Sequence, residues 1–161
     1  MNKPLWAIVI FGFIFILAGC QSVPSSQSWA GATVSPDNAV SIARYQGTGT
    51  WQGRYLSVDY RYSRDDTGMY LEGKVLFTDR AISNYGTLKD FQLSVLFADA
   101  NGQIISTIGI DTNIGDFSPF SFQSNLTIPK GTSAISFTYR GTGVPSDVFD
   151  TGPVQFFQYP H

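Results

Sequence analysis

Few side chains in this chain have the chemistry of catalysts or metal ligands. Its 161 residues include one cysteine, Cys20, one histidine, His161, and one glutamate, Glu72, beside eleven aspartates. A Ser-His-Asp or Cys-His pair needs its histidine held rigidly beside a nucleophile, and the last residue of a chain is commonly frayed. Zinc sites draw on several histidines or cysteines. We therefore expect no nucleophilic catalysis, no metal site and no cofactor.

The carboxylates form no clear catalytic or calcium-binding pattern. Glycoside cleavage uses a pair of carboxylates, and Glu72 is predicted on the solvent side of a strand. The segment 111–116 has oxygen ligands at its first and third positions, as calcium loops do. Asp116 and Phe122, however, stand where an EF-hand loop has its glycine and its glutamate. We expect an ordinary loop between strands there, and an enzyme that works through aspartates alone is the minor alternative.

The residues that precede Cys20 indicate a role for this cysteine other than catalysis or metal binding. An apolar run from Leu5 to Leu17 follows Lys3 and ends in small residues, which is the pattern of a secretory signal. As a helix this run covers about 20 Å, short of the roughly 30 Å hydrocarbon core of a bilayer. A cleaved signal is therefore favoured over the alternative, an uncleaved membrane anchor.

The sequence Leu17-Ala18-Gly19-Cys20 resembles the lipobox of bacterial lipoprotein precursors. This resemblance implies cleavage before Cys20, diacylglycerol on its thiol and acylation of the new amino terminus. Two such membrane signals already anchor a protein stably, so three acyl chains should hold it permanently. Gln21 rather than Asp follows the cysteine, which implies sorting to the outer membrane in a cell with two membranes.

The rest of the chain divides into a tether and one domain. We expect a signal peptide over 1–19, a lipidated cysteine with a flexible tether and a short helix over 20–46, and a β-sandwich domain over 47–161. The helix is predicted from about 36 to 45, with continued disorder as the alternative, because Ser35 and Pro36 suit a helix start. Cleavage would leave nine basic and twelve acidic groups. The arginines are scattered, so we expect no nucleic-acid binding.

Strands dominate from Thr48 onward, because apolar residues recur at every second position. One such face runs from Leu56 to Tyr62, and turn-forming residues follow at 64–68, 99–102 and 129–131. The last apolar segment spans 154–159. The Gly-Thr repeats at 47–50 and 141–143 are expected to be loops near sheet ends. Seven or eight short strands predict an all-β fold, an antiparallel sandwich, with a small closed barrel as the alternative.

The order of strands and turns between Leu88 and Gly131 resembles the small immunoglobulin-like or fibronectin-type sandwiches of bacterial envelope proteins. These sandwiches share no catalytic site, so the resemblance carries over no functional residue. The tryptophan and cysteine pair of antibody domains is missing from this chain.

Aromatic residues on or beside the first predicted hairpin are the remaining candidates for function. Trp51, Tyr55 and Tyr70 are the predicted binding surface, whereas Tyr60 and Tyr62 share the parity of core residues. We expect a membrane-anchored envelope lipoprotein whose non-catalytic sandwich binds a protein partner. The alternative is a module that binds a glycan or peptidoglycan through exposed aromatic rings.

Overall fold

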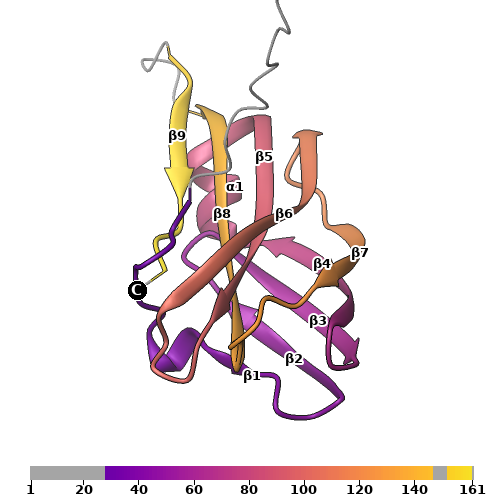
Figure 1. Cartoon of the computed structure of the whole chain (residues 1–161). Coiled ribbons are helices and arrows are strands. Elements are labelled where there is room, and N and C mark those ends of the chain that lie inside the picture. Colours follow the sequence, from indigo (N-terminus) through magenta and orange to yellow (C-terminus); the bar gives the residue numbers. More distant parts are fainter. Residues whose placement is uncertain (1–27, 147–151, 161) are drawn as a thin grey trace, which may run out of the picture.

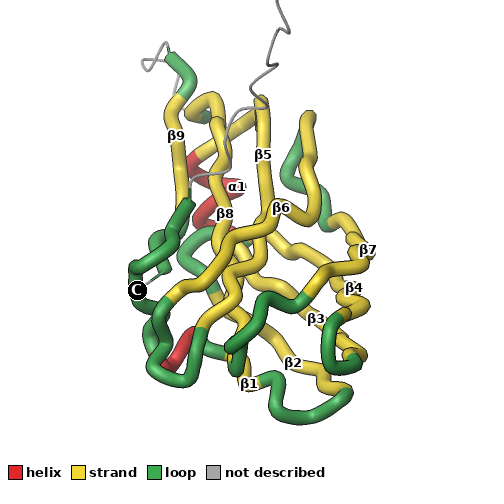
Figure 2. The backbone as a smooth tube through the Cα atoms, in the orientation of Figure 1, coloured by secondary structure: helices red, strands yellow, loops and turns green. Residues whose placement is uncertain are grey.

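The computed structural model describes residues 28–146 and 152–160 (Figure 1). The predicted signal peptide, Cys20 and the first part of the tether lie outside these residues. Strands make up most of the described chain, and helices are short (Figure 2).

Two antiparallel sheets form a sandwich, as predicted from the series of short strands and turns. The first sheet has the order β2-β3-β4-β7, with β2 at Gln46–Gln52, β3 at Leu56–Arg64, β4 at Gly68–Phe77 and β7 at Phe120–Thr127. The second has the order β1-β8-β5-β6, with β1 at Val40–Ser41, β8 at Ala134–Pro145, β5 at Tyr85–Ala98 and β6 at Ile104–Gly115. β9, at Val154–Phe157, also pairs with β8. The described strands form two open sheets, so the closed barrel is excluded.

Two predicted hairpins are present, and an aspartate organises each turn. Asp65 Oδ1 accepts hydrogen bonds from the N–H groups of Thr67 and Gly68, at 2.8 and 2.7 Å, between β3 and β4. These bonds lower the pKa of Asp65 because they favour its charged form. Asp99 Oδ1 likewise accepts from the N–H groups of Asn101 and Gln103 between β5 and β6.

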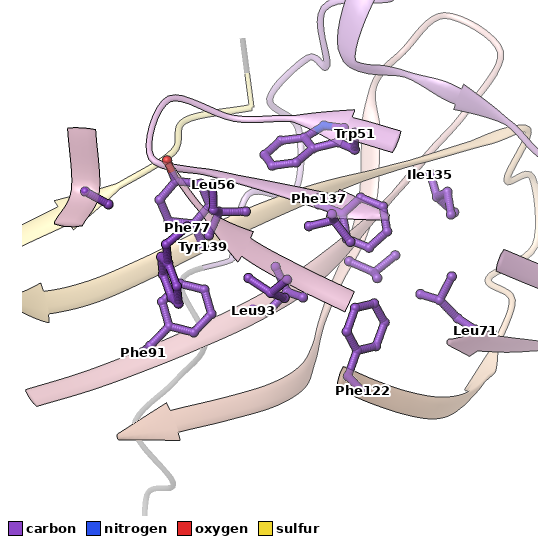
Figure 3. Packing of buried hydrophobic residues seen from close by; sticks show 14 of the residues in the cluster. Trp51, Leu56, Leu71, Phe77, Phe91, Leu93, Phe122, Ile135, Phe137 and Tyr139 are labelled. Atoms are coloured by element: carbon purple, nitrogen blue, oxygen red, sulfur yellow. The ribbon is translucent and has the colours of Figure 1, made fainter. Parts of the chain in front are cut away.

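The core between the sheets is rich in aromatic rings (Figure 3). Phe137 is 1% exposed, and its ring centre lies 5.8 Å from that of Trp51 and 5.7 Å from that of Tyr60. Tyr139 is buried too, and burial raises its pKa to about 12. Its hydroxyl accepts a hydrogen bond from the N–H of Tyr55 at 3.0 Å, so the polar end of this ring is satisfied.

Glycines make room for these rings inside the strands. Gly47 and Gly49 on β2 stand opposite Tyr62 and Tyr60 on β3, and a Cβ on either glycine would come within 2.6 Å of a tyrosine ring atom or hydroxyl. We predicted loops at this Gly-Thr repeat and at the one over 141–143, which was wrong. Both lie in strands, because aromatic side chains fill the space that the glycines leave.

Other local predictions also differ from the structure. The helix predicted over 36–45 is only a 3-10 turn, η1, at Pro36–Asn38, followed by β1. Ile42 is fully buried in the core, and tertiary packing of the extended chain there outweighs the weak helical signal. The loop predicted over 111–116 belongs largely to β6. A helix that we did not predict, α1 at Asp79–Asn84, links the two sheets and is capped by Thr78.

Part of the predicted tether packs against the second sheet. Val34 is buried with Leu96, Ala98 and Ile104 on the face of that sheet that points away from the core. The N–H of Gly31 donates to the carbonyl of Ile104 at 3.0 Å, and Ile104 donates back to Ala32 at 2.8 Å. The folded domain therefore begins before residue 47, because the outer face of the second sheet is itself apolar at this end.

Candidate functional site

The three residues predicted to form a binding surface lie in different places. Trp51 was expected at the surface, and this is wrong, because it is 4% exposed and lies between the sheets (Figure 3). Its register opposite Val58 points the indole inward. Its neighbour Gly53 leaves the space that the ring occupies.

Tyr55 is half-buried at one end of the sandwich. Its ring centre lies 6.0 Å from that of Tyr85 and 5.7 Å from that of Phe156. The guanidinium of Arg54 lies 5.3 Å from the centre of the Tyr55 ring, within reach of a cation–π contact. Tyr55 therefore closes the end of the core instead of forming part of a broad surface.

Tyr70 is exposed on the outer face of the first sheet, where polar side chains surround it. Its hydroxyl donates to Glu72 Oε2 at 3.1 Å, and Glu72 Oε1 lies 3.4 Å from Arg61 Nη1. Partial desolvation and the contact with Glu72 raise the pKa of Tyr70. Beside this group lies an open hollow of about 430 Å³ that is lined by Asp59, Lys74 and other polar residues.

A second group of aromatic residues lies on the opposite side of the sandwich. Trp29, Phe157 and Tyr159 form what we call the aromatic patch. The ring centre of Tyr159 lies 5.4 Å from that of Trp29 and 4.7 Å from that of Phe157, both edge-on. Phe157 is 42% exposed and Tyr159 is 44% exposed, so large apolar areas of two packed rings face solvent.

Polar groups border the aromatic patch. Arg140 stands opposite Phe157 in the β8–β9 ladder, and its Nε donates to Gln92 Oε1 at 2.9 Å. Arg140 forms no salt bridge with a carboxylate of the described residues. A hollow of about 440 Å³ runs beside it and is lined by Asp90, Gln155 and both exposed rings. The patch thus combines aromatic surface with a cation held in place by an amide.

Sequence reasoning missed this patch for two reasons. Trp29 lies in a segment rich in Ser, Gln, Ala and Gly, which predicted a tether. From the sequence alone, either Phe156 or Phe157 could face solvent, because the direction of each side chain is decided only when β9 pairs with β8. That pairing buries Phe156, which is 3% exposed, and turns Phe157 outward. A large aromatic residue in an otherwise polar linker was the one usable signal.

The described residues offer no evident catalytic or metal centre. No group of three or more His, Cys, Asp or Glu side chains lies close enough together there to hold a metal ion. Nor does any helix in residues 28–146 or 152–160 have the length and hydropathy to span a membrane. Comparison of the chain with family models, with curated proteins and with solved structures finds no match.

Proposed function

We propose that this chain is a lipid-anchored protein of the bacterial cell envelope whose non-catalytic sandwich binds a protein partner through the aromatic patch. The observation that carries the proposal is the packing of Trp29, Phe157 and Tyr159 beside Arg140. Trp, Tyr and Arg are the residues that most often dominate the energy of protein interfaces.

The position of the patch fits an anchored protein. Trp29 lies nine positions after Cys20, so the connecting chain can span at most about 30 Å. A lipid on Cys20 would keep the patch close to a membrane surface. The partner that we propose is therefore itself a membrane or membrane-associated protein of the envelope, and the lipobox pattern favours the outer membrane.

The strand order supports an immunoglobulin-like sandwich as the scaffold. Immunoglobulin strands A, B and E are neighbours in one sheet, and C, F and G are neighbours in the other, with C′ added beside C in variable domains. The orders β3-β4-β7 and β6-β5-β8-β9 follow the same scheme.

Native protein extracted from membranes is expected to begin at Cys20 and to carry acyl groups. Mass spectrometry of its N-terminal peptide measures both features, and Cys20→Ala is expected to abolish the lipid mass and the membrane association. Native protein that retains residues 1–19 and has no acyl group would contradict the anchor.

Tyr159→Ala is expected to reduce partner recovery by about tenfold or more in photo-crosslinking on intact cells, since loss of an interface anchor costs at least about 1.4 kcal/mol. Tyr70→Ala is the matched control. It removes a ring of similar exposure, 36% against 44%, on the opposite sheet, and should leave recovery unchanged.

The same pair of variants tests the glycan alternative. Tyr70 lines a second hollow on the first sheet, of about 310 Å³, where the amide of Gln46, the hydroxyl of Ser63 and the guanidinium of Arg61 suit a saccharide. Binding of purified peptidoglycan or surface polysaccharide that is lost in Tyr70→Ala and kept in Tyr159→Ala would favour that reading over a protein partner.

A further inference from the structure

In the described part of the chain, the edge of β7 that faces away from β4 has no charge, proline or bulge to protect it. β7 pairs with β4 over eight consecutive residue pairs without a register shift, and it ends the first sheet (Figure 1). The described backbone bonds of residues 120–127 go to β4. The strand Phe120–Thr127 contains no charged residue and no proline. A regular edge of this kind presents a row of N–H and C=O groups that serves as a template for pairing with another extended chain.

Each of the other sheet edges lacks at least one of these features. β1 and β9 have two and four residues, and β6 contains Asp111 and is paired irregularly with β5. β2 is regular, but two of its three inner positions are Gly47 and Gly49, so only Trp51 brings an apolar side chain to its inner face. Among the described edge strands, β7 is the one that combines a regular backbone with apolar side chains along most of its inner face.

We infer that β7 pairs antiparallel with β7 of a second copy of this chain, which joins the two first sheets into one continuous sheet. A two-fold axis at Ser124 places apolar side chains opposite apolar ones and polar side chains opposite polar ones. Phe122 meets Leu126 on the inner face, Gln123 meets Asn125 and Ser121 meets Thr127 on the outer face. Opposed side chains of these kinds stabilise antiparallel pairs.

The half-buried ends of the edge favour this register. Phe120 and Ile128 pack against the core and are only partly covered. In the register centred on Ser124, Phe120 of one copy lies opposite Ile128 of the other, so each pair covers apolar surface. No like charges meet anywhere along the edge, and the same surface serves both copies, as a two-fold dimer requires. This dimer does not depend on the lipid or on the aromatic patch.

Ser124→Cys in the full-length membrane-anchored protein tests the pairing. Residues that face each other across an antiparallel pair have Cα atoms about 4.5–5.5 Å apart, within the range of a disulfide. We expect most of this variant to run as a covalent dimer on a non-reducing gel. Ser121→Cys is the matched control on the same strand, because its partner in this register is Thr127, and it is expected to stay monomeric.

A second variant separates failed pairing from failed folding. Gln123→Lys with Asn125→Lys, added to Ser124→Cys, places ammonium groups opposite one another at exposed positions. This variant should lower the dimer fraction at least tenfold and leave the thermal unfolding midpoint unchanged.

Equal crosslinking of Ser124→Cys and Ser121→Cys, or none in either, would overturn the dimer. So would a Ser124→Cys adduct with a different protein, which would assign the edge to another partner. Mass spectrometry of Cys20 and the Tyr159→Ala experiment read out the proposed function separately.

Discussion

Phe137→Ala is expected to lower the free energy of unfolding by about 3–5 kcal/mol, the range for removing a buried phenylalanine from a packed core. Phe137 lies on β8, is 1% exposed, and contacts Trp51 and Tyr60 across the space between the sheets. The cavity cannot collapse easily because its walls are strands held in long ladders. Urea unfolding of the purified protein, followed by tryptophan fluorescence, measures the change.

Phe157→Ala is the matched control for Phe137→Ala. Phe157 is 42% exposed and loses mainly its edge contact with Tyr159, so we expect a loss of at most about 1 kcal/mol. If both substitutions cost the same free energy, the assignment of Phe137 to the centre of the core would be wrong.

Gly73→Ala is expected to destabilise the protein by about 2–3 kcal/mol, as overpacking of a tight interior does. A Cβ at Gly73 would lie 2.5 Å from the carbonyl oxygen of Asp59 and 2.7 Å from Cζ of Phe122. The first of these atoms belongs to the backbone of β3, which cannot rotate away. β3 and β4 must therefore shift apart to remove this clash, and the shift weakens the hydrogen bonds between them.

Gly86→Ala provides the control for Gly73→Ala, because the atom nearest to its added Cβ is Ser146 Oγ at 3.6 Å. Here alanine reduces the freedom of the unfolded chain without a clash, and we expect a change within about 1 kcal/mol, in the stabilising direction. Equal unfolding midpoints for the two alanine variants would contradict the close packing at Gly73. The same urea titration serves both pairs.

The strand positions and the hairpins were predictable from the sequence because they rest on local signals. Leu56, Val58 and Tyr62 alternate with polar residues and are all buried, as predicted. The turns at Asp65 and Asp99 form where aspartate precedes a glycine, since the carboxylate accepts bonds from the following N–H groups. Both signals act over a few residues and need no knowledge of the rest of the fold.

The sequence-based predictions failed where the local structure depends on residues far away in the chain. The Gly-Thr repeats predicted loops, but Tyr60 and Tyr62 cover the glycines of β2 and keep it in the sheet. Residues 36–45 carried a helix-start pattern, yet burial of Ile42 in the core holds the chain extended. In each case a side chain from another strand decided the local conformation, and such contacts cannot be read from neighbouring residues.

The sequence by itself determined the all-β class of the domain, two of its hairpins and the scarcity of groups for catalysis, because periodicity, turn chemistry and residue counts are local properties. Only the tertiary structure decided which aromatic residues reach the surface. Trp51 is buried by its pairing with β3, and Trp29, Phe157 and Tyr159 meet because the N-terminal segment and β9 both lie along the second sheet. The exposure of each aromatic ring depends on which strands become neighbours, and contacts between residues far apart in the chain determine this.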